Sequence, residues 1–298
     1  MMSRSKNNIT RNLIVDLSNI VFVSYFANKN EFTKGLLIHK VIENMLYMFR
    51  EYKPDAITIA CDSPNVWRRD LYTEYKASRE LNRDENYEEV KEVMIELKDF
   101  FNTCTNIRAI SIDRCEADDI IAVFSELSKK LGYETIIYSN DRDFFQLLDE
   151  STSLHSPIKD KGRINYDISN REYDLFMKCI RGDRGDNIFS AYPRVRETKI
   201  KQAWGDKVEY LNFMETIPKN MDKRVSEMFA LNKSLIDLSM IPDNIRTAIK
   251  DEFQKRFAEN MNYDFVKVGL FMGRYSLKKI MMDLNQYAIM FKSGKIIL

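Results

Sequence analysis

The stretch that decides the fold runs from Asp113 to Asp143 and reads DRCEADDIIAVFSELSKKLGYETIIYSNDRD. It places five acids at the edges of an apolar helix and an apolar strand, namely Glu116, Asp118, Asp119, Asp141 and Asp143. Acids crowded at the ends of such elements repel one another unless positive charge lies among them. The stretch therefore predicts part of a divalent-metal site.

The same letters predict the local structure. ADDIIAVFSELSKKL has the periodicity of an amphipathic helix that ends at Gly132, and ETIIYSND is typical of a buried strand that ends in Asp141. Acids in the first turn of a helix stabilise its dipole by about 0.3–1 kcal/mol each. This effect accounts for one or two acids, whereas three within four positions exceed what capping requires.

Two earlier strands also end in an aspartate. NLIVDLSN contains Asp16 and DAITIACD ends in Asp62, and NIRAISID predicts a further strand before the helix. For either aspartate alone, a role in a turn or a helix cap is the alternative explanation. The alternation of strands and helices predicts an α/β fold, with a mostly parallel central sheet flanked by helices and a helical C-terminal region.

Two more acids, Asp183 and Asp186, lie around the glycines of RGDRGDNI. Because the carboxyl ends of parallel strands share one edge, most of the nine acids are expected to converge there. Oxygen ligands without histidine or cysteine select Mg²⁺ or Mn²⁺. So many carboxylates suit two ions about 3.5–4 Å apart, an arrangement that supports phosphodiester hydrolysis. An aspartyl-phosphate phosphatase would instead need a DxDx[TV] motif, which Asp16-Leu17-Ser18 does not provide.

The charge distribution agrees with such a site. The 298-residue chain has 46 Lys and Arg against 45 Asp and Glu, but setting the nine clustered acids aside leaves 36 acids against 46 bases. An acidic centre within a basic surface suits an enzyme acting on a phosphate backbone. The four cysteines form no CxxC pair and there are only two histidines, so zinc is not expected. Reduced thiols, no apolar leader and no apolar run long enough for a membrane span indicate a cytoplasmic protein.

Residues 64–89 interleave bases with aromatic residues, and two interpretations stay open. Mixed charge of this kind is usually a solvated helix face. It is also typical of a segment that grips a single strand, with rings stacking on bases and cations meeting phosphates. The residues concerned are Arg68, Arg69, Lys76, Arg79 and Arg83, with Trp67, Tyr72 and Tyr75.

The rest of the chain predicts a sheet-edge hairpin at residues 151–168 and, from about residue 206, Lys- and Met-rich helices interrupted at Pro218 and Pro242. We expect two domains: an α/β domain at 12–182, with an arch or cap at about 64–89, and a helical DNA-binding domain at 183–298.

The order of the motifs resembles the 5′-nuclease family of flap endonucleases and 5′→3′ exonucleases, and within it the RNase H group of T-even-type bacteriophages. The motifs that carry the resemblance are LIVDLSN, ACDSPNVWRRDLYTEYKASRE, CEADDIIAVF, YSNDRDFFQLL and RGDRGDNI, in the family's order over roughly the first 190 residues. NKSLIDLSMIPDNI, at 232–245, adds a weaker likeness to the phage group.

The resemblance implies roles for the acids. The first metal would be surrounded by Asp16, Asp62, Glu116, Asp118 and Asp141, and the second would be held by Asp143, Asp183 and Asp186 with Asp118 or Asp141 shared. Asp119 is included among the metal residues, although orienting a neighbouring ligand is its alternative role.

The resemblance also implies roles for the cations. Lys76 would neutralise the scissile phosphate, and Arg79 would assist the charge of the transition state. Tyr72 or Tyr75 would stack on a base, and Arg68, Arg69 and Arg83 would contact nucleic acid in the same arch. One departure is AYPRVRETKIKQAW, which lacks the glycine turn found in many members and argues against a K⁺ site. Duplex would then be bound by side-chain charge, from Arg194, Arg196, Lys199 and Lys201.

The expected function is a Mg²⁺-dependent 5′→3′ exonuclease and flap endonuclease with RNase H activity, which removes RNA primers and 5′ flaps during lagging-strand replication. Its expected partners are branched or nicked DNA and RNA–DNA hybrids with a free 5′ end, together with single-strand DNA-binding protein or a sliding clamp. We expect a monomer in the host cytoplasm. Two rival interpretations are a PIN-like ribonuclease acting on structured RNA, which usually lacks the YKASR arch, and a non-catalytic replication-fork binding module.

Overall fold

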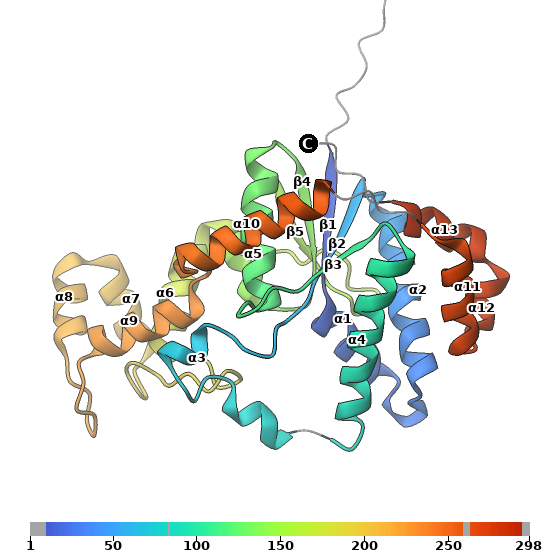
Figure 1. The fold of residues 1–298 in the computed structure, drawn as a ribbon. Helices are drawn as coiled ribbons and strands as arrows, with labels where there is room; N and C mark the ends of the chain where they lie inside the picture. The colour runs from blue at the N-terminus through green and yellow to red at the C-terminus, as the bar shows by residue number, and fades with distance from the viewer. Residues whose placement is uncertain (1–9, 83, 259–262, 294–298) are drawn as a thin grey trace, which may run out of the picture. The chain divides into compact units, whose positions relative to one another are not determined.

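A single parallel sheet organises the fold (Figure 1). The structure is a computed structural model that describes residues 10–82, 84–258 and 263–293. The strand order is β3-β2-β1-β4-β5, and every pairing is parallel. The strands are β1 (Arg11–Asp16), β2 (Ala56–Ala60), β3 (Arg108–Ile110), β4 (Glu134–Tyr138) and β5 (Thr152–His155). This confirms the predicted fold class.

The central strand β1 is buried on both faces. Leu13, Ile14 and Val15 are fully buried, as expected for an apolar run in a sheet covered on both sides. Register places Asp16 beside Ala60 of β2, and Val15 beside Tyr138 of β4. The chain runs outward from β1 through β2 and β3, then returns to the other side of β1 for β4. This reversal makes a topological switch point at the carboxyl end of β1, where open α/β sheets bind their ligands.

Helices cover both faces of the sheet. One face packs against α5 (Ala117–Lys130), whose apolar residues Ile120, Ile121 and Phe124 are fully buried. The other face carries three helices that bury their apolar sides together. They are α1 (Leu17–Ala27), α2 (Lys34–Tyr52) and α4 (Tyr87–Cys104), with the short η1 (Lys29–Glu31) between α1 and α2.

Two of the C-terminal helices return to this second helical layer, whereas an earlier one contacts α5 on the other face. The ring of Phe271 stacks on Phe100 of α4 at 4.2 Å between centroids, and Phe291 meets the same ring edge-on at 5.4 Å. The elements are α10 (Asp243–Ala258), which contacts α5, then α11 (Phe265–Arg274), α12 (Lys278–Met282) and α13 (Leu284–Lys292). Apolar contacts therefore join α11 and α13 to α4.

Two compact units result from this packing. The first comprises residues 1–64, 85–165 and 243–298, and the second comprises 65–84 and 166–242. This division differs from the expected linear one, with its single boundary after residue 182. The physical reason is that Phe271, Met272, Met290 and Phe291 complete the apolar core of the first unit.

The second unit has its own core. Phe176, Ile180, Ile200 and Phe213 lie at its centre, and a smaller cluster forms around Tyr75. Its elements are α3 (Arg68–Leu71), η2 (Ala77–Asn82), η4 (Ile168–Asn170), α6 (Arg171–Arg181), α7 (Glu197–Gly205), α8 (Lys207–Glu215), α9 (Val225–Ile236) and η5 (Leu238–Met240). The segment predicted as an arch thus contains two short helical turns.

The expected hairpin at 151–168 is wrong in one respect. β5 pairs in parallel with β4, and the return chain contributes only an isolated antiparallel bridge between His155 and Arg163. Thr152 and Leu154 are buried, which favours addition to the sheet over a separate hairpin. Among the helices of the described ranges, none is long and apolar enough to cross a membrane.

Candidate metal centre and basic segment

Asp16 lies at the carboxyl end of β1 and is the N-cap of α1. Its Oδ1 accepts a hydrogen bond from the backbone N–H of Asn19 at 3.1 Å, and its Oδ2 accepts one from the Ser139 hydroxyl at 2.9 Å. The side chain is almost fully buried. Strand pairing brings Ser139 to this position, because it directly follows Tyr138, the partner of Val15.

Asp62 links the end of β2 to the start of α5. One of its oxygens accepts a hydrogen bond from the backbone N–H of Ala117 at 2.9 Å, and the other accepts one from the Ser18 hydroxyl. The residue itself is exposed. The hydrogen bonds of Asp62 therefore connect the end of β2 to the starts of α1 and α5.

The start of α5 carries three predicted metal residues. Glu116 is its N-cap and is 3% exposed, and Asp118 is half-buried. Asp119 is 0% exposed, and its Oδ2 accepts a hydrogen bond from the backbone N–H of Glu116 at 3.0 Å. This contact favours the alternative role for Asp119, in which it orients Glu116.

Asp141 and Asp143 follow β4 on the opposite side of the switch point. The backbone N–H of Asp143 donates to Oδ1 of Asp141 at 2.8 Å, so Asp141 caps the short helical turn η3 (Arg142–Leu147). The backbone N–H of Asp141 donates to the Ser139 hydroxyl at 3.1 Å. Ser139 therefore connects the acids that follow β1 and β4.

The acids at this edge disfavour one another's charge. Burial raises the pKa of Asp16 to about 7, and repulsion by Asp62 and Asp141 adds to this, although the hydrogen bonds from Asn19 and Ser139 act in the opposite direction. A cation among the three carboxylates would relieve the repulsion. The all-oxygen donor set also fits a hard divalent ion such as Mg²⁺.

The carboxylates nevertheless do not form one compact ligand set. Within residues 10–82, 84–258 and 263–293, no group of three or more His, Cys, Asp or Glu side chains is close enough to hold a metal ion. Both oxygens of Asp16 and both of Asp62 accept hydrogen bonds from protein donors. Each of these oxygens keeps a second lone pair that could face an ion.

The pKa of Asp16 leads to a stability prediction for the metal-free protein. Folded Asp16 keeps its proton up to about pH 7, whereas in the unfolded chain it loses it near its ordinary value of 3.8. The free energy of unfolding should therefore fall as the pH rises through this interval, by up to roughly 4 kcal/mol from this group. Urea unfolding in EDTA at pH 4.5 and pH 7.5 measures the change.

The control for this prediction is Asp16→Asn, because another group opposes the trend. Burial lowers the pKa of His155 to about 4, which makes the folded state more stable as the pH rises. His155 is the same in both proteins, so the difference between wild type and Asp16→Asn isolates Asp16. Equal pH dependence in the two proteins would contradict the prediction.

Asp119→Ala tests the orienting role. Loss of the acceptor leaves the buried N–H of Glu116 without this hydrogen bond, so the free energy of unfolding should fall by about 1–3 kcal/mol. Asp119→Asn keeps an oxygen acceptor and should recover most of the loss. Its Mn²⁺ affinity, measured by electron paramagnetic resonance, should stay within about threefold of wild type; a loss of tenfold or more would show that Asp119 is itself a ligand.

The remaining two acids belong to the second unit. Asp183 pairs with Lys178 at 2.9 Å, and its Oδ1 accepts a hydrogen bond from the backbone N–H of Gly185 at 2.8 Å. Burial works against ionisation of Asp183, but the hydrogen bond and charge of Lys178 hold its pKa below the ordinary value. Asp183 is therefore ionised at neutral pH.

Asp186 is contacted by the basic segment. Nη2 of Arg79 donates to its Oδ1 at 2.5 Å, and the Tyr75 hydroxyl donates to its Oδ2 at 3.3 Å. The ammonium of Lys76 lies 3.8 Å from the same Oδ2. The structure thus brings both predicted catalytic cations to a predicted metal ligand.

Two predicted nucleic-acid contacts need correction. Arg68 is 2% exposed; its Nε donates to the backbone carbonyl of Leu235 at 2.9 Å, and its guanidinium lies 4.5 Å from the centre of the Trp67 ring. Tyr75 is 3% exposed and packs in an apolar cluster with Ile188 and Leu235. Both side chains lie in the interior of the second unit, because residues from α6 and α9 cover them. Neither is therefore exposed for contact with nucleic acid.

The other predicted contacts differ in exposure. Arg69 is exposed, Tyr72 is half-buried, and Arg83 lies outside the described residues. Arg194 and Arg196 are exposed at the start of α7. Lys199 donates to the Tyr192 hydroxyl at 2.9 Å, and Lys201 pairs with Glu197 at 3.2 Å.

Sequence reasoning missed four residues that orient the acids and the basic segment: Ser18, Ser139, Lys178 and Asn187. Ser18 and Ser139 stand within two residues of Asp16 and Asp141, so a search for hydroxyls beside strand-end acids would have found them. Lys178 lies five residues before Asp183, on α6. Asn187 directly follows Asp186, and its side chain donates to the carbonyl of Glu74 at 2.9 Å.

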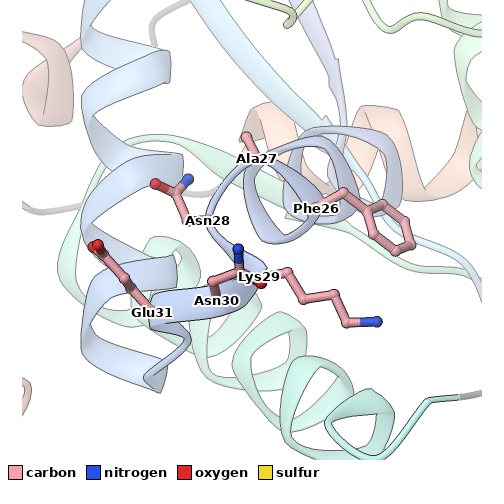
Figure 2. A pocket seen from close by; sticks show the side chains of 6 residues that line it. All are labelled: Phe26, Ala27, Asn28, Lys29, Asn30 and Glu31. Atoms are coloured by element: carbon pink, nitrogen blue, oxygen red, sulfur yellow. The ribbon is translucent and has the colours of Figure 1, made fainter.

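A surface pocket lies apart from all these residues. It has a volume of about 260 Å³, and Figure 2 shows its lining, which runs from Phe26 to Glu31 between α1 and α2. None of the predicted ligands or cations lines it. The acid-rich edge of the sheet remains the better candidate for chemistry, because the predicted ligands of the first unit lie there.

Comparison with known proteins agrees with this geometry. A family model described as the 5′-3′ exonuclease, N-terminal resolvase-like domain matches residues 11–174, more than half of the chain. The chain belongs to this 5′-3′ exonuclease family. The match includes β1, β2, β4 and all seven predicted metal residues of the first unit.

Relatives of this 5′-3′ exonuclease family member differ in how much of their length the chain spans. Ribonuclease H of Enterobacteria phage T4 is 26% identical over 284 residues, covering 86% of this chain and 92% of that protein. The 5′-3′ exonuclease of Aquifex aeolicus is 23% identical, covering 92% and 94%. DNA polymerase I of Streptococcus pneumoniae is 27% identical over 209 residues, and the chain spans only 23% of its length.

Solved structures share the fold. The D15 protein of T5, co-crystallised with metal ions, is 18% identical with a TM-score of 0.62, and the match covers 84% of this chain and 100% of that one. The bacteriophage T5 D15 flap endonuclease in complex with DNA and metal ions is 19% identical with a TM-score of 0.63, covering 83% and 98%.

Proposed function

We propose that this protein is a divalent-metal-dependent 5′-nuclease that hydrolyses phosphodiester bonds near a free 5′ end in flapped DNA and RNA–DNA hybrids. The observation that carries the proposal is the group of acids at the carboxyl ends of β1, β2 and β4, where burial and mutual repulsion raise the pKa of Asp16 to about 7. Phage T4 ribonuclease H and the Aquifex aeolicus exonuclease, matched over more than nine-tenths of their lengths, support the substrate class.

The chain's acids divide into two proposed sets. Asp16, Asp62, Glu116, Asp118 and Asp141 would hold the first ion. Asp143, Asp183 and Asp186, with Asp118 or Asp141 shared, would hold the second. When bound, such ions activate water and stabilise the leaving oxygen. Ser18, Ser139 and the N–H of Asn19 orient the carboxylates through the hydrogen bonds described above.

The cations act on the substrate. Lys76 neutralises the scissile phosphate, and Arg79 stabilises charge that develops on its oxygens in the transition state. Arg194 and Arg196, both exposed, bind the phosphate backbone. Because these contacts reach phosphates and not base edges, recognition depends on structure and salt more than on sequence.

The biological setting is part of the proposal. Removal of RNA primers and 5′ flaps during lagging-strand synthesis in the host cytoplasm would use this activity. Single-strand DNA-binding protein or a sliding clamp are candidate partners at the fork.

The test is cleavage of two labelled substrates, a DNA with a 5′ flap and an RNA–DNA hybrid. With Mg²⁺ both should be cut to products that carry a 5′-phosphate, and EDTA should abolish the reaction. Closing the flap into a hairpin removes the free 5′ end and should reduce cleavage strongly. Cutting of structured RNA alone would favour the PIN-like alternative, and DNA binding without cleavage would favour a binding module.

A further inference from the structure

The turn at residues 74–79 is attached to the loop at 185–187 by two kinds of contact within the second unit. The first kind uses the backbone. The Lys76 N–H donates to the Asp186 carbonyl at 2.9 Å, and the Asn187 side chain donates to the Glu74 carbonyl at 2.9 Å. The second kind is ionic, between Asp186 and the side chains of Lys76 and Arg79.

The backbone attachment involves two residues with positive φ angles. Lys76 and Asn187 both have φ of 58°, in the left-handed region that residues other than glycine adopt only at a cost. Such conformations persist where surrounding contacts impose them. Tyr75 and Ile188, which neighbour these two residues in the chain, are both buried in one apolar cluster. This part of the attachment is therefore built into the core of the unit.

The ionic attachment is of a different nature. Arg79 is exposed, whereas the side chains of Asp186 and Lys76 are 14% and 15% exposed, so one partner of the ionic attachment lies in solvent. Both Asp186 oxygens face protein donors: Oδ1 accepts from Arg79, and Oδ2 from Tyr75 with Lys76 nearby. A divalent ion on this carboxylate would meet the like charges of Lys76 and Arg79 at close range. The ion and the two cations therefore compete for this carboxylate, because the ion would repel both of them.

We propose that Asp186 exchanges the Lys76 and Arg79 side chains for a divalent ion, while Asn187 and the Lys76 N–H keep the turn attached. Asn187 is thus a positioning residue, since it fixes where the two cations lie without contacting substrate. The exchange makes the cations available to substrate phosphates only after metal has bound. The inference rests on the proposed function, because it requires Asp186 to hold metal.

The experiment follows two properties of Lys76 in the full chain as Mg²⁺ is added. Acylation of lysine amines, measured by mass spectrometry, reports the ammonium, and hydrogen exchange reports the backbone N–H. Mg²⁺ should speed acylation of Lys76 at least fivefold and change exchange of its N–H less than twofold. Lys129, which pairs with Asp149 at 2.6 Å within the first unit, is the control and should not respond.

Two variants separate the two attachments. In Asp186→Asn, Lys76 should be acylated rapidly with or without Mg²⁺. Acylation as slow as in the metal-free wild type would overturn the proposal. Asn187→Gly keeps the left-handed backbone unstrained but loses the side-chain donor. It should speed exchange of the Lys76 N–H while α6 amides stay as in the wild type, and an unchanged Lys76 rate would remove Asn187 from its role.

Failure of this inference can be told apart from failure of the proposed function. Mn²⁺ binding to the wild type is measured separately by electron paramagnetic resonance. Mn²⁺ binding with unchanged Lys76 acylation overturns the exchange alone. Absence of Mn²⁺ binding overturns both the exchange and the proposed metal-dependent nuclease.

Discussion

Replacing Asp141 and Asp143 together with asparagine is expected to slow Mg²⁺-dependent flap cleavage by on the order of 10³-fold or more. The two acids follow β4 beside the switch point of the sheet, where they supply two of the negative charges proposed to hold metal. Asparagine removes both charges but keeps an oxygen at Oδ1. The hydrogen bond from residue 143 to residue 141 can therefore persist, and the fold should not change.

Single-turnover cleavage of the flap substrate at saturating protein measures this effect on the chemical step. Thermal unfolding of the double variant should match the wild type, which excludes misfolding as the cause. Asp113→Asn is the matched control, because Asp113 is an exposed acid just before α5. It should cleave at the wild-type rate. A double variant that cleaves within tenfold of wild type would show that the site is elsewhere.

Gly182→Ala is expected to destabilise the loop that carries Asp183 and Asp186. Gly182 has φ of 72°, and a Cβ at this position would lie 2.3 Å from the Ile188 carbonyl oxygen and 2.7 Å from the carbonyl of Phe189. These are backbone atoms, held by the paired hydrogen bonds between Asp183 and Ile188 at 2.9 and 2.7 Å. Because they cannot move aside cheaply, the free energy of unfolding should fall by about 2–4 kcal/mol.

The chain offers a close control for this variant. Gly132 has φ of 74°, but a Cβ added to it would meet no atom within 4 Å among the described residues. Gly132→Ala therefore carries the backbone strain without the clash and should cost about 1 kcal/mol. Urea unfolding of both variants measures the difference. Flap cleavage should fall only in Gly182→Ala, and equal stability losses would mean that the loop accommodates the methyl group.

Several features of this protein could be predicted from the sequence because they depend on near neighbours. The helix predicted from ADDIIAVFSELSKKL follows from its apolar periodicity and from Gly132, and α5 begins at Ala117 and ends at Lys130. Asp16, Asp62 and Asp141 were expected at one edge because each ends or directly follows a strand, and parallel strands share their carboxyl edge. Local pattern and the rules of parallel sheets were sufficient for these residues.

Other features could not be predicted, because they depend on which distant segments meet. Arg68 and Tyr75 belong to a stretch with the composition of an exposed surface, yet residues from α6 and α9 cover them. Asp119 is next to Asp118 in the sequence, but it is buried and its carboxylate accepts a hydrogen bond from the N–H of Glu116. Strand pairing decided which acids Ser18 and Ser139 contact: β2 beside β1 brings Asp62 to Ser18, and β4 beside β1 brings Ser139 to Asp16.

The sequence by itself determined the parallel sheet, the acids at its edge and the family, since these follow from periodicity and from the spacing of short motifs. Only the tertiary structure decided that the last helices complete the first unit, through Phe271 and Phe291 against Phe100. It also decided that Asp186 holds the two candidate catalytic cations. Burial and ion pairing are set by the segments that lie opposite a residue, and in both cases those segments are far away along the chain.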